Sequence, residues 1–203
     1  MIRAIPLATL FLVLGAPRCD AEPPQRAEGD WPCRQVKVAS LSLEAIWSGP
    51  PIDHSQQAQS DPALSDLVGR LAARRTPLQE AQKLVSEFAQ STGTMRKERL
   101  TQLFARLYDK LDAERSQVMG GLERYGRAQK EAAQRLREDT QKLREAQDAR
   151  RDAAEIKELS TALAWNTRMF EERRRALVYA CETPALIEQR LGALARMILA
   201  AMA

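Results

Sequence analysis

The sequence predicts an all-α protein with a compact helical base and a long antiparallel coiled-coil-like helical hairpin. Residues 127–182 contain neither glycine nor proline and begin with a run of strong helix formers. Between residues 100 and 125 the apolar positions are mostly three or four residues apart, the spacing of a helical seam. The pairs Asp61-Pro62, Thr76-Pro77 and Thr183-Pro184 each place a proline after a polar residue, which is typical of helix starts. Together these patterns favour helices throughout the chain.

Residues 1–21 are expected to be a signal peptide. A short basic start precedes the apolar stretch 4–15, and small residues lead to Ala21, after which we expect cleavage. The apolar stretch is shorter than the roughly 20 residues that a retained membrane anchor needs. Cys19 offers a lipid anchor as an alternative, which Arg18 disfavours because lipoprotein processing requires a small residue before the cysteine. We therefore expect an exported, periplasmic protein.

The charge of the chain is nearly balanced. It has 31 lysines and arginines against 27 aspartates and glutamates, which gives a formal net charge of +4. The two signs are interspersed, so the sequence lacks the concentrated basic stripe that nucleic-acid binding requires. We expect no nucleic-acid partner.

Two cysteines remain after the expected cleavage, Cys33 and Cys181. Their spacing fits neither a C-x-x-C motif nor a zinc site. In an oxidising compartment, an isolated pair of this kind indicates one disulfide. The disulfide would close a loop of about 148 residues. In the chain-entropy model, this lowers the entropy of the unfolded state and destabilises that state by roughly 4 to 5 kcal/mol. The alternative is two unrelated buried thiols.

The part of the chain before the first clear helix divides into a leader and an arm. Residues 22–30 are polar, with paired prolines, and indicate a disordered leader. Residues 31–59 are expected to form an apolar arm and a loop that pack across the helices. Within the arm, Val36 and Val38 alternate with polar neighbours as in an extended stretch, whereas residues 43–47 fit one helical turn.

Two short amphipathic helices are expected next. Asp61 can cap a helix that opens at Pro62. Thr76 can cap a second helix that opens at Pro77, with Gln79 completing a capping box, and Thr92-Gly93 ends it. Their apolar faces are Leu64, Leu67, Val68 and Leu71 in the first helix and Leu78, Ala81, Leu84, Val85 and Phe88 in the second.

The long hairpin is expected over residues 96–181. Gly120, Gly121 and Gly126 interrupt the seam of its first arm, and each costs about 1 kcal/mol relative to alanine inside a helix. The sequence favours a kink within a continuing helix, because the same periodicity holds on both sides. A hinge and the close approach of another backbone are the alternatives.

The hairpin is expected to project from the base. Residues 127–155 have only a thin alanine and leucine seam, and a helix so polar cannot be deeply buried. A reversal between Ala146 and Ala154 would bring the second arm back along the first, apolar against apolar. The apolar residues of that second arm are Leu159, Leu163, Trp165, Met169, Phe170, Leu177, Val178 and Tyr179. Thr183 and Pro184 then indicate a separate C-terminal helix over residues 184–203, packed into the core.

Groups that perform chemistry are scarce in this sequence. The single histidine, His54, lies beside Asp53 in the expected loop, and no second histidine or free mature cysteine completes a metal or nucleophile site. Neither of the two glycine motifs that bind phosphates occurs. We therefore expect no enzyme, no cofactor, and no catalytic, cofactor-binding or metal site.

Two segments carry a resemblance to other proteins. Trp31-Pro32-Cys33 with the following Val-Ala-Ser-Leu-Ser at 38–42, and the stretch CETPALIEQRL at 181–191, resemble an uncharacterised group of exported proteobacterial helical proteins. The resemblance implies that a covalent link between the arm and the last helices is shared by the group. It implies no activity, and no catalytic residue is carried over.

These features predict a scaffold or interaction protein of the cell envelope. Its expected partner is another envelope protein or a second copy, bound through the polar faces of the hairpin. The alternative is a peripheral binder of a membrane surface or an anionic envelope polymer, which does not span the membrane and uses basic helix faces such as Arg173–Arg175. For those arginines, exposed ion pairs with Glu171 and Glu172 are the simpler expectation.

Overall fold

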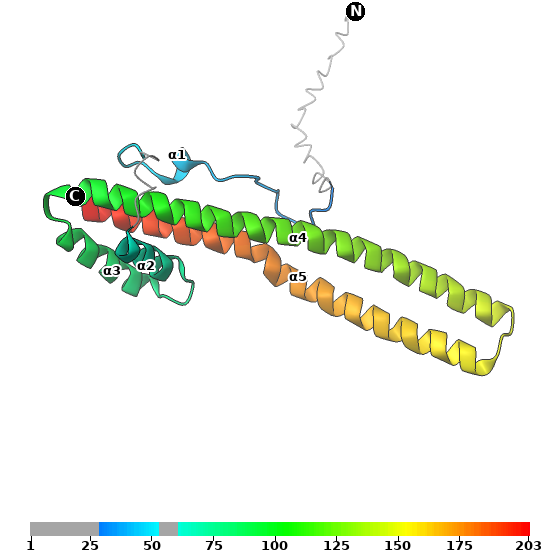
Figure 1. The fold of residues 1–203 in the computed structure, drawn as a ribbon. Helices are drawn as coiled ribbons and strands as arrows, with labels where there is room; N and C mark the ends of the chain where they lie inside the picture. Colours follow the sequence, from blue (N-terminus) through cyan, green and yellow to red (C-terminus); the bar gives the residue numbers. More distant parts are fainter. Residues whose placement is uncertain (1–28, 53–60) are drawn as a thin grey trace, which may run out of the picture.

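The computed structural model describes residues 29–52 and 61–203 (Figure 1). The helices are α1 (Leu43–Ile46), α2 (Pro62–Ala72), α3 (Leu78–Ser91), the 3₁₀ turn η2 (Gly93–Met95), α4 (Arg96–Asp148) and α5 (Ala153–Met202). No strand occurs in these described ranges, so the predicted all-α class is confirmed. The predicted signal peptide at 1–21 and most of the predicted leader lie outside the described residues. Within them, no helix is both apolar and long enough to cross a membrane.

Helices α4 and α5 form the long axis of the molecule. With 53 residues at a rise of 1.5 Å each, α4 is about 80 Å long. The connection at 149–152, in which Arg150 has a φ of 50°, falls within the interval where the sequence predicts a reversal. Figure 1 shows that the chain turns back there and that α5 lies beside α4. Hydrogen bonds between the two helices join Arg115 to Glu188, Tyr125 to Arg173 and Asn166 to Asp139.

The hydrophobic core lies at one end of this pair. Helices α2 and α3 pack there against α4 and the C-terminal part of α5, while the arm that contains α1 follows α4 on the other side in Figure 1. Trp47 of the arm stacks on Phe104 of α4, with ring centroids 4.0 Å apart. Leu194 and Ile198 near the end of α5 are fully buried, as expected for core packing of the C-terminus. The largest apolar side chains that are almost completely inaccessible are Leu64, Leu71, Val85, Leu100, Leu103, Phe104, Leu107, Leu111, Leu191, Leu194 and Ile198.

The helix starts agree with the sequence at α2 but not at α3. Asp61 Oδ1 accepts a hydrogen bond from the Leu64 amide at 2.9 Å, and all four predicted core residues of α2 are buried. The predicted Thr76 cap of α3 is wrong, since α3 begins at Leu78 and has no side-chain cap. The Thr76 amide donates to Ala73, and its carbonyl accepts from Arg190, so this residue is part of the turn that closes α2.

The separate C-terminal helix predicted at 184–203 is also wrong. Helix α5 continues through Pro184, so the second long arm does not end at residue 181. A proline inside a helix removes one backbone hydrogen bond and crowds the carbonyl four residues earlier, which favours a bend. Figure 1 shows a change of direction in the orange segment of α5. Buried residues on both sides, Cys181 and Ile187, hold the helix in place there.

The glycines of α4 allow a close approach of the arm. The continuing helix is confirmed, but Figure 1 shows no sharp bend in α4, so the predicted kink is not observed. A methyl group on Gly126 would overlap the backbone carbonyl of Asp30. At Gly120 and Gly121, the nearest atoms belong only to the side chain of Arg124 on the same helix. At Gly126, therefore, the chain at Asp30, just before the arm, lies against the α4 backbone.

Several predicted contact residues are exposed instead. In the arm, Val36 and Val38 are exposed, because this segment is held by a backbone contact: the Val38 carbonyl accepts from Arg115 at 2.7 Å. In α5, Trp165, Val178 and Tyr179 are 61%, 61% and 74% exposed, so they do not face the first arm as predicted. The half-buried apolar residues of this part of α5 are Ile156, Leu159, Leu163, Met169, Phe170 and Leu177.

Candidate functional site

The arm is fastened to the helices around Cys33 and Cys181. The two sulfurs form a disulfide, with the Cα atoms 5.7 Å apart, in agreement with the pairing that the sequence indicates. Trp31 packs beside this bridge, in a cluster with Met119 and Leu122 of α4. The Trp31 indole donates to the backbone carbonyl of Gln35 at 2.8 Å. The side-chain amide of Gln35 in turn donates to the backbone carbonyl of Cys181. This cluster fixes the start of the arm across the middle of the α4–α5 pair.

Arg115 fastens the next part of the arm. Its side chain is only 2% exposed, and its Nε lies 2.6 Å from an oxygen of Glu188 in α5. Its Nη2 donates to the Val38 carbonyl, while Nη1 has no partner among the described residues. Sequence reasoning missed this residue. The available signal was its position four residues after Leu111, where the seam of α4 requires a buried residue.

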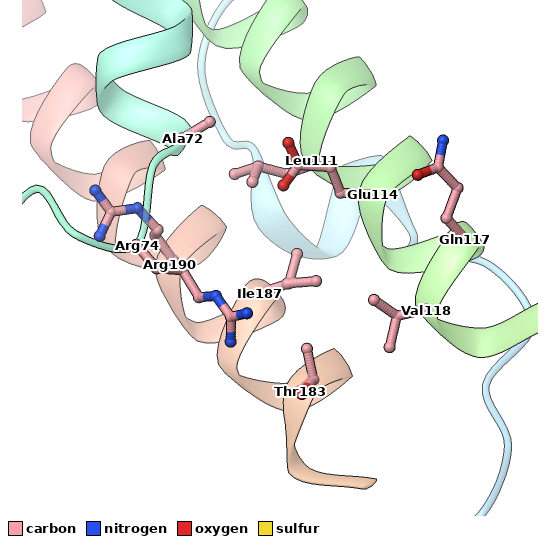
Figure 2. A pocket seen from close by; sticks show the side chains of 9 residues that line it. All are labelled: Ala72, Arg74, Leu111, Glu114, Gln117, Val118, Thr183, Ile187 and Arg190. Carbon is pink, nitrogen blue, oxygen red and sulfur yellow. The ribbon is translucent and has the colours of Figure 1, made fainter. Parts of the chain in front are cut away.

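A cavity of about 320 Å³ lies where α2, α4 and α5 meet (Figure 2). Val118 and Ile187 face each other across it in Figure 2. Arg190 lines the cavity, but its guanidinium donates to the carbonyls of Leu71 at 2.8 Å and Thr76 at 3.0 Å. Burial lowers the pKa of Arg190 from its ordinary value. Arg190 therefore holds the end of α2 and the following turn, a second role that the sequence did not reveal.

The other polar side chains around the cavity do not form a reaction centre. Glu114 is paired with Lys110, one turn earlier on the same helix, at 3.0 Å. Thr183 is the only hydroxyl among the lining residues, and the lining contains no carboxylate pair, histidine or thiol that would activate it. The cavity is best described as a gap between the helices that Arg190 bridges.

The residues that the sequence offers as functional groups lie partly inside and partly outside the described ranges. Asp53 and His54 lie outside the described residues. Over residues 29–52 and 61–203, no three His, Cys, Asp or Glu side chains are grouped so that they could hold a metal ion. Arg173, Arg174 and Arg175 are all exposed, and Arg174 pairs with Glu171 at 2.8 Å. An ion pair of this exposure contributes little to stability, typically about 0 to 1 kcal/mol.

The part of α4 and α5 beyond the disulfide is thinly packed. Between residues 127 and 180 the only buried residue is Ala146. Most ion pairs of this segment join residues three or four apart, such as Arg135 with Glu131 and Lys142 with Asp139. At its start, Arg127 and Lys130 instead pair with Asp30. We refer to residues 127–180 as the projection. Its surface is polar apart from the exposed side chains of Trp165, Val178 and Tyr179.

Comparisons with protein-family models, with curated proteins and with solved structures found no match to this chain. The candidate site therefore depends on the geometry described above.

Proposed function

We propose that this protein is an exported helical scaffold or interaction protein of the cell envelope, without a catalytic site. In this proposal, α4 and α5 form an antiparallel coiled-coil-like hairpin whose projection is the contact surface. One observation carries the proposal: the projection contains two long helices in which only Ala146 is buried. In proteins, most helical stability comes from packing of an apolar face. Helices that bury so few side chains are therefore expected to function as an exposed surface and not as part of the core.

The disulfide and the sequence of residues 1–21 support the location. Disulfides persist in oxidising compartments such as the bacterial periplasm. The pairing of Cys33 with Cys181 suits such a compartment, and so does the signal-peptide pattern before Ala21. Pulse labelling in a bacterial host tests this part. We expect a processed chain that begins at Glu22 and reaches the periplasm, and an unprocessed cytoplasmic chain would contradict it.

Site-specific photo-crosslinking tests the contact surface. A crosslinking amino acid is placed at exposed positions of the projection, such as Arg137 and Lys157, and at exposed positions of α3, such as Gln82 and Ser86, as controls. In intact envelopes we expect adducts with protein from the projection positions and few from α3. Adducts from α3 alone, or from no position, would contradict the proposal.

A second candidate function is supported by the exposed arginines 173–175. In this alternative, the basic face of α5 binds a membrane surface or an anionic envelope polymer. Vesicles with and without anionic lipid distinguish it, since binding through these arginines requires the anionic lipid and weakens as salt screens the charges. Replacing the three arginines with glutamine would abolish such binding and leave crosslinking through the projection intact.

A further inference from the structure

Six exposed residues of α5 repeat the spacing of a coiled-coil seam. They are separated by four and three residues in alternation: Ala154, Glu158, Thr161, Trp165, Arg168 and Glu172. The half-buried apolar residues of α5 that accompany α4, such as Leu159 and Leu163, belong to a different helix face. We call the six residues the outer seam. No part of the described chain covers the outer seam, since all six residues are exposed.

Trp165 is the prominent apolar residue of the outer seam. Its side chain is 61% exposed, whereas the other two tryptophans, Trp31 and Trp47, are buried. Beside it lies a shallow hollow of about 640 Å³ that includes Ala154, Thr161 and the ring of Trp165 itself. Tryptophan is enriched among the residues that dominate binding energy at protein interfaces. The outer seam thus offers both a large side chain and a hollow whose lining combines the small residues Ala154 and Thr161 with polar side chains such as Glu158.

We propose that two copies of this chain associate through their outer seams, antiparallel, with Trp165 of each copy in the hollow of the other. This inference rests on the proposed function and names a second copy as the partner. A twofold contact uses the same patch on both copies, so the patch must be complementary to itself. In an antiparallel coiled coil, the two kinds of seam position face each other. Trp165 then lies opposite Thr161 of the second copy, and Thr161 lies opposite Trp165.

The charges of the outer seam favour this register. With Trp165 opposite Thr161, Glu158 of each copy lies opposite Arg168 of the other, so the contact contains two complementary ion pairs. Neither Glu158 nor Arg168 has an ion pair within the described chain. A parallel alignment would place Glu158 on Glu158 and Arg168 on Arg168. An antiparallel alignment centred on Trp165 would place Glu158 on Glu172. Like charges disfavour both alternatives.

The first test measures the mass of the oxidised mature chain against its concentration by sedimentation. We expect a monomer and dimer equilibrium that Trp165→Ala weakens about tenfold or more. Val178→Ala is the matched control, because Val178 is an equally exposed apolar residue of α5, at 61%, but does not fall on the spacing of the outer seam. Circular dichroism checks that both variants remain helical. Equal weakening by both variants, or a monomer at every concentration, would overturn the inference.

Charge reversal tests the register. Glu158→Arg and Arg168→Glu each turn the two complementary pairs into repulsive ones, so each variant alone is expected to be monomeric. A mixture of the two variants restores both pairs and is expected to form a one-to-one heterodimer. The double variant E158R/R168E is expected to form a homodimer again. Single variants that associate as strongly as the parent chain, or a mixture that stays monomeric, would overturn the proposed register.

The same variants separate this inference from the proposed function. If the chain is monomeric but crosslinks through the projection to a different envelope protein, the second copy is wrong as the partner and the proposed function stands. If the chain forms the dimer but gives no adducts in envelopes, the dimer stands and the envelope role fails. If Trp165→Ala instead abolishes binding to lipid vesicles by a monomeric chain, the outer seam binds a membrane surface and the inference is overturned.

Discussion

Asp61 joins the start of α2 to α4 through two contacts of its carboxylate. One oxygen accepts from the Leu64 amide, and the other pairs with Arg99 of α4. The hydrogen bond from Arg99, followed by that from Leu64, holds the pKa of Asp61 below its ordinary value of 3.8. A carboxyl group whose folded pKa is lowered stabilises the fold above its unfolded pKa. This contribution is lost as the pH falls through the folded pKa.

We expect Asp61→Ala to lower the free energy of unfolding by about 1 to 2 kcal/mol, because it removes both the cap and the ion pair. Asp61→Asn keeps an amide oxygen that can cap the helix, so its cost at pH 7 is smaller. Urea unfolding from pH 7 downward tests the charge. The difference between the parent chain and Asp61→Asn should persist to about pH 4 and shrink at lower pH. A difference independent of pH would contradict the role of the charge.

Gly126 and Gly121 provide a matched pair of substitutions in α4. A methyl group at Gly126 meets the Asp30 backbone, whereas the nearest atom at Gly121 is an Arg124 side-chain nitrogen at 3.8 Å. We expect Gly126→Ala to destabilise the fold by about 1 to 3 kcal/mol through displacement of the arm. Gly121→Ala is expected to stabilise it by about 0.5 to 1 kcal/mol, because alanine favours the helix. Thermal unfolding compares them, and equal effects would contradict the close contact at Gly126.

At the scale of the elements, the sequence predicted a helix cap correctly where both hydrogen-bond partners are close together in the chain. The cap of α2 needs only Asp61 and an amide three residues later, so its pattern could be interpreted correctly. The cap of α3 could not, because Arg190, which is 114 residues away, binds the carbonyl of Thr76. The local pattern at Pro184 indicates a helix start, but α5 continues through it. The contacts that keep α5 helical before and after Pro184 are tertiary, so the local sequence does not reveal them.

Helix α5 shows a second limit of periodicity. Its large apolar residues do not all share one helix face, because Trp165 and Tyr179 fall outside the set that contains Leu159 and Leu163. The structure places Leu159 and Leu163 toward the interior and leaves Trp165 exposed. The helical period therefore predicted the helix, but the list of its apolar residues did not show that Trp165 would be exposed. The disulfide was predictable because only two of the three cysteines, Cys33 and Cys181, lie outside the expected signal peptide.

Arg115 connects α4 to α5 and to the arm. Replacing Arg115 and replacing its partner Glu188 are expected to have different effects on stability. Glu188 is 39% exposed, so it can be solvated if Arg115 is replaced, whereas Arg115 is 2% exposed and cannot. We expect Glu188→Ala to cost about 1 to 3 kcal/mol, because it leaves the buried Arg115 charge without its carboxylate, while the partial exposure of Glu188 lets water screen part of that loss. Arg115→Met, which fills a similar space, should cost less. In the Arg115→Met background, Glu188→Ala should have almost no further effect on urea unfolding, and additive costs would contradict the coupling.

The whole molecule combines a base with a packed core and a projection with almost none. Apolar residues of α2, α3, α4 and α5 bury one another at the base, while the projection relies on helix propensity and on short-range ion pairs. Stability is therefore expected to be uneven along α4 and α5, with fast amide exchange toward residues 149–152 and slow exchange near Leu107 and Leu194. The arm lies between these two regimes, because few of its side chains are buried.

The disulfide is expected to decide whether the arm stays on the helices. Removing a native bridge that closes a long loop typically costs about 2 to 5 kcal/mol. We expect the double variant Cys33→Ser/Cys181→Ser to lose this amount and to show faster amide exchange at residues 31–40, while α2 and α3 keep their protection. Their contacts with α4 and the end of α5 do not involve the bridge. If the arm remained protected without the disulfide, Arg115 and Trp47 would suffice to hold it. Alkylation of the unreduced native chain is the control, since two reactive thiols would show that the bridge had not formed.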